Sequence, residues 1–333
     1  MLDKINKVDP IDILKIENGI YSDKNKKNRF SLQLMLFRAC NFGCKYCITH
    51  SKPENINYDN LNLGFKNLDK FIKYHNDFFK EIETTQIQFM GGEPTLIDIC
   101  EYLDKIQDNS FKEFRLMTNL FRPNKYFEDL QKYLFSRKID IDITTSFHAG
   151  KITIEDFVDK MNCLISLFGD KSIRSHVIVN DETLPIVKKL EEKIGDNKNF
   201  HMMYRKDLTS RGKISNEVSD FINNKKKKNY TKGNTKITLK DGSEFLIGAC
   251  DLRYVFGEKV FNPCGYFCET MSGKRVCKID FANGNIMTCK ASYTKESTIG
   301  NLFENNYKFD TCKNICTNQT CNFSNPGDII WKV

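Results

Sequence analysis

Strand-forming and helix-forming segments alternate along the first two thirds of this 333-residue chain. Short apolar runs predict strands, and the segments between them repeat apolar residues every three or four positions, as amphipathic helices do. The predicted strands are 32–38, 86–90, 113–118, 140–146, 173–179 and 199–204. The predicted helices are 61–80, 95–108, 124–136, 153–168 and 183–194.

This alternation predicts an α/β fold, because successive right-handed βαβ units build a parallel sheet. The helix over 153–168 illustrates the pattern, since Phe157, Met161 and Leu164 share one face and Gly169 follows as a C-cap. Six strands and five helices allow an open doubly wound sheet or a curved (β/α)6 partial barrel. In both folds the active residues lie at the carboxyl ends of the strands.

Cysteine usage indicates metal or catalytic chemistry rather than a disulfide scaffold. The chain has 13 Cys in 333 residues. This fraction of about 4% is below the roughly 8–10% that marks a disulfide framework, and an odd count prevents complete pairing. The first fifteen residues lack the apolar core of a signal peptide, and no apolar run approaches the roughly 18 residues of a membrane span. We therefore expect a cytoplasmic protein without membrane contact, whose thiols stay reduced.

The charge does not favour nucleic acid as a partner. The formal net charge is +8 and the pI is 8.7, below the pI of roughly 9 expected of a nucleic-acid-binding domain. The one dense basic run, Lys225–Lys228, lies in a polar stretch and is interpreted as a solvated segment. Contact with a phosphate or another anionic partner is the alternative.

Three cysteines follow the first predicted strand at C-x3-C-x2-C spacing, namely Cys40, Cys44 and Cys47. Three thiolates can hold three irons of a [4Fe–4S] cluster, which leaves the fourth iron open to bind another molecule. Zinc, with His50 as the fourth ligand, is the alternative metal.

The second predicted strand runs directly into Gly91-Gly92-Glu93-Pro94, after which a helix begins. Adjacent glycines allow the backbone to approach a ligand closely and to offer it main-chain polar groups. An ordinary strand-to-helix turn is the competing interpretation of this motif on its own.

Together these motifs resemble those of radical S-adenosylmethionine (SAM) enzymes. The resemblance rests on Cys40, Cys44 and Cys47, on Tyr46 before the third cysteine, and on GGEP one βα unit later. It covers about residues 30–205 and implies the partial barrel, with SAM chelating the open iron. It further implies reductive cleavage of SAM to a 5′-deoxyadenosyl radical, hydrogen abstraction from a substrate C–H, and an external one-electron reductant of the flavodoxin or ferredoxin type.

The resemblance also suggests which residues line the SAM pocket. The expected SAM-binding residues are Tyr46, Gly91, Gly92, Glu93, Pro94, Thr118, Asn119 and Ser146. Other polar residues at strand ends, which could equally be helix caps, are His148, Asn180 and Tyr204-Arg205. No catalytic residue is identified.

A second group of cysteines brackets a predicted hairpin, whose arms are 274–281 and 286–288 and whose turn contains Asn283-Gly284. The order C…G-x4-C…IGNL…C-x3-C-x4-C resembles the SPASM/Twitch extensions of radical SAM enzymes, which carry auxiliary [4Fe–4S] clusters. The preferred ligands of one auxiliary cluster are Cys268, Cys289, Cys316 and Cys321, with Cys312 as an alternative ligand. Cys264 and Cys277 could support a second cluster, and structural zinc is the competing metal.

The remaining cysteines are interpreted as structural. Cys100 and Cys163 lie in helical patterns and are predicted to be buried apolar thiols. Cys250 is interpreted as structural, with hydrogen-atom donor or ligand as alternatives.

These features predict four segments and a class of reaction. The segments are an N-terminal extension over 1–29, a radical SAM barrel over 30–205, a Lys-rich linker or insert over 206–249 and an iron–sulfur domain over 250–333. The resemblance favours a peptide side chain as the substrate, as in peptide maturation. Radical oxidation, epimerisation or rearrangement of a sugar or aminocyclitol is one alternative, and a zinc-stabilised nucleic-acid-binding protein is the alternative from another class.

Overall fold

The chain divides into two compact units, seen here in a computed structural model. Unit 1 consists of residues 1–32, 229–279 and 283–333, and unit 2 of residues 33–228 and 280–282. The structure describes residues 12–18, 30–47, 70, 84–105, 111–195, 197, 199–207, 214–227, 235–247, 266–268, 276–280, 283–287, 298–307 and 329–332.

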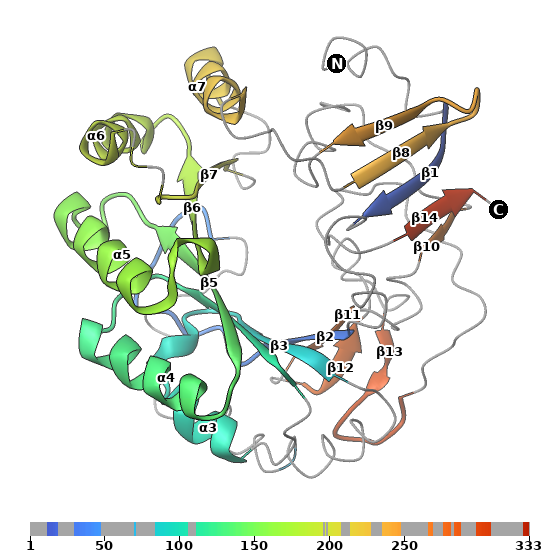
Figure 1. Ribbon diagram of the computed structural model, residues 1–333, viewed down its shortest axis with the longest axis horizontal. Helices are drawn as coiled ribbons and strands as arrows, with labels where there is room; N and C mark the ends of the chain where they lie inside the picture. The colour runs from blue at the N-terminus through green and yellow to red at the C-terminus, as the bar shows by residue number, and fades with distance from the viewer. Residues whose placement is uncertain are drawn as a thin grey trace. The chain divides into compact units, whose positions relative to one another are not determined.

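Unit 2 is built on a sheet whose strands follow the order β2-β3-β4-β5-β6-β7 (Figure 1). Neighbouring strands from β3 to β7 pair in parallel. The strands are β2 (Phe30–Met35), β3 (Thr84–Met90), β4 (Glu113–Thr118), β5 (Asp140–Phe147), β6 (Ile173–Val179) and β7 (Met202–Lys206).

The helices of unit 2 connect these strands. They are η4 (Pro94–Leu96), α3 (Ile99–Lys105), α4 (Asn124–Ser136), α5 (Ile154–Phe168), η5 (Asp170–Ser172), α6 (Leu184–Ile194) and α7 (Asn216–Lys227). The bounds of α5 follow from its caps: the Thr153 hydroxyl accepts from the Asp156 N–H at 3.1 Å, and Gly169 ends the helix at φ 83°.

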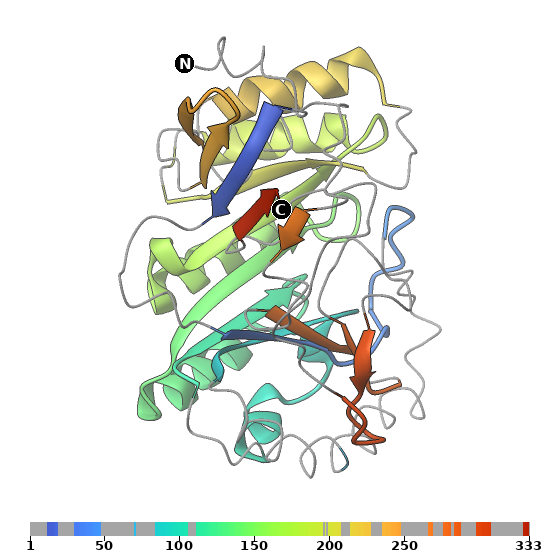
Figure 2. The ribbon, with the colours of Figure 1, turned by 90° about the vertical axis from the view of Figure 1, so that its right-hand side faces the viewer.

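The predicted α/β class and parallel sheet are confirmed. Helices α3 to α6 gather on one face of a curved sheet in Figure 1, and Figure 2 shows the strands in front of them. This arrangement matches a partial barrel, because an open doubly wound sheet carries helices on both faces. The predicted helix over 61–80 lies outside the described residues except for Lys70.

One side of each strand forms the core of unit 2 by packing on the helices. Phe89 and Phe114 are fully buried with ring centroids 5.1 Å apart, and the α3 residue Tyr102 lies 5.2 Å from Phe89. In the same way Phe147 of β5 meets Phe157 of α5 at 4.9 Å. Edge-to-face packing of this kind adds to the free energy gained by burying the rings.

The other side of the sheet, here called the open face, is polar and half-exposed. Burial alternates along β4, β5 and β6, which places Arg115, Asp142 and Arg174 on the open face. Both guanidinium groups contact Asp142 Oδ2, at 3.0 Å from Arg115 and 2.7 Å from Arg174. The sequence pattern predicted the strands but not this ion pair across three of them.

Unit 1 contains an antiparallel sheet that joins the beginning, the middle and the end of the chain. Its strand order is β10-β14-β1-β8-β9, so β1 pairs with both β14 and β8. These strands are β1 (Ile13–Asn18), β8 (Thr235–Leu239), β9 (Glu244–Ile247), β10 (Tyr266–Cys268) and β14 (Ile329–Lys332). In the part of the chain that the structure describes, no helix combines the length and the apolar character needed to cross a membrane.

The predicted Asn283-Gly284 hairpin is present. Antiparallel strands β11 (Val276–Asp280) and β12 (Asn285–Met287) form it, and β12 also pairs with β13 (Thr298–Asn301). Gly284 has φ 76°, and a Cβ there would lie 2.5 Å from the Phe303 ring, so the turn requires glycine.

We expect Phe114→Ala to lower the free energy of unfolding by about 3–5 kcal/mol, because it removes a fully buried ring and leaves a cavity against Phe89. The matched control is Phe135→Ala, since the Phe135 ring is 82% exposed and its loss should cost less than about 0.5 kcal/mol. Urea denaturation followed by circular dichroism measures both. Equal losses for the two variants would contradict this account of the core.

Candidate cofactor site

The cysteine motif forms a loop at the carboxyl end of β2. Cys40 is buried, Cys44 and Cys47 are half-buried, and all three are free thiols. The loop turns through Cys47 N–H to Cys44 O at 3.1 Å, and the Phe42 N–H donates to Cys40 Sγ at 3.4 Å. All three predicted ligands therefore lie on one short loop beside the strand ends.

The GGEP motif pairs directly with the start of this loop. Gly92 N–H donates to Phe37 O at 2.8 Å, and Glu93 N–H donates to Ala39 O at 2.9 Å. A Cβ on Gly92 would lie 1.8 Å from Ala39 O, so no other residue fits. The structure thus explains the second glycine as a requirement of close backbone contact between the two motifs.

The Glu93 carboxylate connects the ends of β3 and β4. It is buried and accepts from Thr95 N at 3.1 Å, Thr95 Oγ1 at 2.5 Å, Thr118 Oγ1 at 2.9 Å and Asn119 N at 2.6 Å. Burial raises the pKa of Glu93, while these hydrogen bonds lower it in part. The side chain therefore organises the site, and the predicted contacts of Glu93, Thr118 and Asn119 with SAM stay predictions.

Asn119 connects the strand end to the cysteine loop. Its Nδ2 donates to Asn41 Oδ1 at 2.8 Å and lies 3.7 Å from Cys40 Sγ. An amide donor beside a sulfur stabilises negative charge on it. Asn119 is thus placed to interact with the sulfur of Cys40, one of the predicted ligands.

Sequence reasoning missed the residue that holds the turn after GGEP. Arg122 Nε donates to Thr95 O at 2.6 Å, and its Nη2 donates to Leu96 O at 3.1 Å. Lys160 in turn donates to the Arg122 carbonyl. Because Arg122 lies 27 residues from Thr95 in sequence, no local pattern signals this contact.

His148 lies just beyond the end of β5 and touches the cysteine loop. Its Nδ1 is 3.2 Å from Cys44 Sγ and 3.2 Å from Tyr46 Oη. Burial lowers the pKa of His148 to about 4, and burial raises the pKa of Tyr46. Burial therefore favours the uncharged form of both side chains.

The charges of the neighbouring thiols affect the pKa of Cys40. Burial raises the pKa of Cys40 to about 11, and nearby Glu93, Cys44 and Cys47 add to the rise. Within the described residues, no three His, Cys, Asp or Glu side chains converge in a metal-binding arrangement. The donor set fits an iron–sulfur cluster by its chemistry, because three thiol donors share one short loop.

Other predicted residues are more dispersed. Ser146 is half-buried on the open face. Asn180 stabilises the turn before α6, since its Oδ1 accepts from Thr183 N at 2.9 Å. Tyr204 is buried against Phe221 with ring centroids 5.5 Å apart, and Arg205 is half-buried.

The C-terminal motif is described only in part. The Gly284 carbonyl accepts from the Leu302 N–H at 2.8 Å, which joins the hairpin turn to the IGNL segment. Cys268 lies in β10 and Cys277 in β11, although their side chains are outside the described residues. The other predicted C-terminal cysteines also lie outside the described residues, namely Cys250, Cys264, Cys289, Cys312, Cys316 and Cys321.

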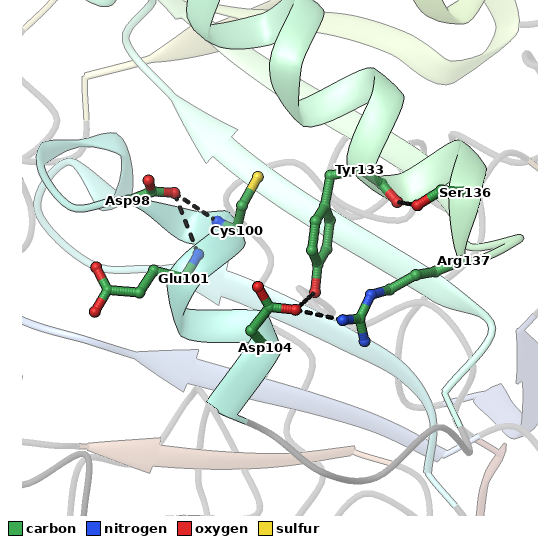
Figure 3. Close-up of polar contacts among 7 residues, drawn as sticks. All are labelled: Asp98, Cys100, Glu101, Asp104, Tyr133, Ser136 and Arg137. Carbon is green, nitrogen blue, oxygen red and sulfur yellow. Dashed lines mark hydrogen bonds and ion pairs between the residues drawn. The ribbon is translucent and has the colours of Figure 1, made fainter.

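Cys100 and Cys163 are half-buried on α3 and α5 rather than fully buried. Figure 3 shows the acidic surroundings of Cys100, where Asp98 caps α3 and Asp104 bonds to Tyr133 and Arg137 of the neighbouring segment. Burial raises the pKa of Cys100 to about 11, and the charges of Asp98 and Asp104 contribute. Its thiol is therefore protonated and weakly reactive at neutral pH.

We expect Cys100 to be alkylated by iodoacetamide about 100-fold more slowly at pH 8 than a thiol of ordinary pKa, because only the thiolate reacts. The rate should rise with pH until the pKa near 11 is passed. Asp104→Asn removes a negative charge and should increase the rate. Peptide mass spectrometry measures it, with Glu101→Gln on the same helix as the control that leaves it unchanged.

We expect Glu93→Ala to destabilise the protein, because each buried donor left without an acceptor costs about 1–3 kcal/mol. The Asn119 and Thr95 N–H groups and the Thr118 hydroxyl lose their acceptor together. Urea denaturation measures the effect against Glu101→Ala, an exposed position on α3. A Glu93→Ala variant as stable as that control would refute this role.

The chain is similar to proteins of known family. A model of the radical SAM superfamily matches residues 34–204, which is 171 of 333 residues. The radical SAM cyclopropyl synthase TigE of Paramaledivibacter caminithermalis is 26% identical over 234 residues, 63% of this chain and 42% of the relative. GTP 3′,8-cyclase of Cronobacter sakazakii is 30% identical over 104 residues, 30% of each chain. The chain thus spans less than half the length of either relative.

One solved structure shows a weak likeness. The crystal structure of Streptococcus suis SuiB matches with a TM-score of 0.36 and 16% identity, over 85% of this chain and 70% of that one. A TM-score this low carries no structural argument.

Proposed function

The chain belongs to the radical SAM superfamily, and from this we propose that it is a radical SAM enzyme whose catalytic [4Fe–4S] cluster is held by Cys40, Cys44 and Cys47. The observation that carries the proposal is the backbone pairing of Gly92 and Glu93 with Phe37 and Ala39. It brings the cysteine loop and the GGEP segment together at the carboxyl ends of β2 and β3.

The bound cluster and SAM would supply one-electron cleavage of SAM and the 5′-deoxyadenosyl radical that abstracts hydrogen from a C–H group. The residues of this chain would bind and orient the cluster and SAM and would exclude water from the site. Glu93 holds Thr118 and Asn119 at the end of β4 through its carboxylate, and Arg122 holds the turn that follows GGEP. The predicted SAM contacts of Tyr46, Gly91, Pro94 and Ser146 are part of this proposal. The required electron comes from an external reductant of the flavodoxin or ferredoxin type.

The C-terminal cysteines are proposed to hold an auxiliary [4Fe–4S] cluster. Cys268, Cys289, Cys316 and Cys321 are the preferred ligands, and Cys312 is the alternative. The hydrogen bond from Leu302 to Gly284 supports this assignment, because it joins two elements of the cysteine-bracketed motif in one compact turn.

The proposed substrate is a peptide side chain. This part of the proposal follows from the cysteine order of the C-terminal segment, which resembles the SPASM/Twitch extensions of radical SAM enzymes. Two relatives are named as a cyclopropyl synthase and a cyclase, which extends the proposal to hydrogen abstraction followed by ring closure.

Anaerobic reconstitution with iron and sulfide tests the proposal. The wild type should absorb near 400 nm and, with dithionite, cleave SAM to methionine and 5′-deoxyadenosine. The Cys40→Ala/Cys44→Ala/Cys47→Ala variant should lose cleavage but keep about four irons at the auxiliary site. Cys100→Ala/Cys163→Ala is the control that should retain cleavage and the full iron content.

Two outcomes would contradict parts of the proposal. Colourless wild-type protein that binds stoichiometric zinc and leaves SAM intact would refute the enzyme. An iron-free triple variant, with active wild type, would refute the auxiliary cluster alone.

A further inference from the structure

His148 is held against the cysteine loop on more than one side. Its ring stacks on Tyr46 with centroids 6.0 Å apart and an interplanar angle of 3°. The Phe42 ring meets it edge-on at 5.5 Å and 75°. These contacts direct Nδ1 at the Cys44 sulfur, 3.2 Å away.

The direction of this hydrogen bond follows from the chemistry of the sulfur. A cysteine that ligates iron is a thiolate, which has no proton and can only accept. The Tyr46 hydroxyl, 3.2 Å from the same Nδ1, can accept as well. The tautomer that carries its hydrogen on Nδ1 can therefore share that hydrogen between the two acceptors in a bifurcated bond, while the Tyr46 hydroxyl also hydrogen-bonds to Cys44.

We propose that His148 donates an Nδ1–H hydrogen bond to the Cys44 sulfur and thereby raises the reduction potential of the catalytic cluster. The inference rests on the proposed function, because it requires Cys44 to be a cluster ligand. His148 acts through Cys44 and is a positioning residue that does not itself react.

The effect on the potential has a defined sign. Reduction adds one negative charge, which the cluster shares with its sulfur ligands, so a donor to a sulfur stabilises the reduced state more than the oxidised state. The contact is part-buried, so water screens it less than it would screen a hydrogen bond at the surface. The Cys40 sulfur also has nitrogen donors beside it, since Phe42 N–H donates to it and Asn119 Nδ2 lies 3.7 Å away.

Two substitutions of His148 distinguish the effect of its N–H donor from the effect of its aromatic ring. His148→Phe keeps an aromatic ring between Tyr46 and Phe42 but has no N–H. His148→Asn loses the ring but places an amide N–H close to the position of Nδ1. His201→Phe is the matched control, because His201 is a half-exposed histidine whose Nε2 lies 3.8 Å from Asp170 Oδ2.

The experiment is a redox titration of reconstituted full-length protein, followed by electron paramagnetic resonance. The signal to follow is the one that the Cys40→Ala/Cys44→Ala/Cys47→Ala variant lacks, which separates the catalytic from the auxiliary cluster. At fixed potential we expect the ratio of reduced to oxidised cluster to fall about tenfold in His148→Phe, or about 59 mV for one electron. His148→Asn should stay close to the wild type, and His201→Phe should match it.

Each outcome decides the inference. Support comes from a lower potential in His148→Phe alone, or from loss of cluster iron in His148→Phe while His148→Asn retains it. Equal potentials, equal shifts or equal loss of iron in the two variants would overturn it. Failure of the proposed function is read separately, from wild-type protein that lacks the signal and does not cleave SAM, and this result overturns both.

Discussion

Two backbone hydrogen bonds carry the architecture of the site: Gly92 N–H to Phe37 O at 2.8 Å and Glu93 N–H to Ala39 O at 2.9 Å. They extend the contact between β2 and β3 beyond the strands, to the residue that precedes Cys40. Because a Cβ on Gly92 would meet Ala39 O at 1.8 Å, the pairing depends on glycine at this position. The cysteine loop is thereby fixed to the sheet at its first cysteine.

Glu93 extends this constraint from two strands to three. Its backbone binds the segment after β2, while its carboxylate accepts from Thr95, Thr118 and Asn119. A buried carboxylate is costly unless donors surround it, and here the donors come from the turn after β3 and from the end of β4. The charged residue that the motif suggested as a cofactor contact therefore also determines how the strand ends are arranged.

Local patterns predicted strands β2 to β7, helices α3 to α6 and the two motifs, because hydrophobic period and residue spacing are properties of short segments. They did not predict the sheet of unit 1 or helix α7, which lies within the expected linker. The helix over 124–136 was found with its observed bounds. Contacts between distant segments left no such signal: Arg122 reaches Thr95 across 27 residues, and His148 reaches Cys44 across 104. Strand alternation likewise placed Arg115 on one face of the sheet without showing that it shares Asp142 with Arg174.

The parallel sheet explains why residues so distant in sequence reach the same loop. Carboxyl ends of parallel strands lie at one edge of the sheet, so Asn119 after β4 and His148 after β5 both face the loop that follows β2. Each brings a nitrogen to a different cysteine sulfur, at 3.7 Å and 3.2 Å. The cysteine spacing determines where the sulfurs are, whereas the strand order determines which polar groups surround them. Two chains with the same cysteine motif can therefore differ in the electrostatics of the sulfurs through single residues at strand ends.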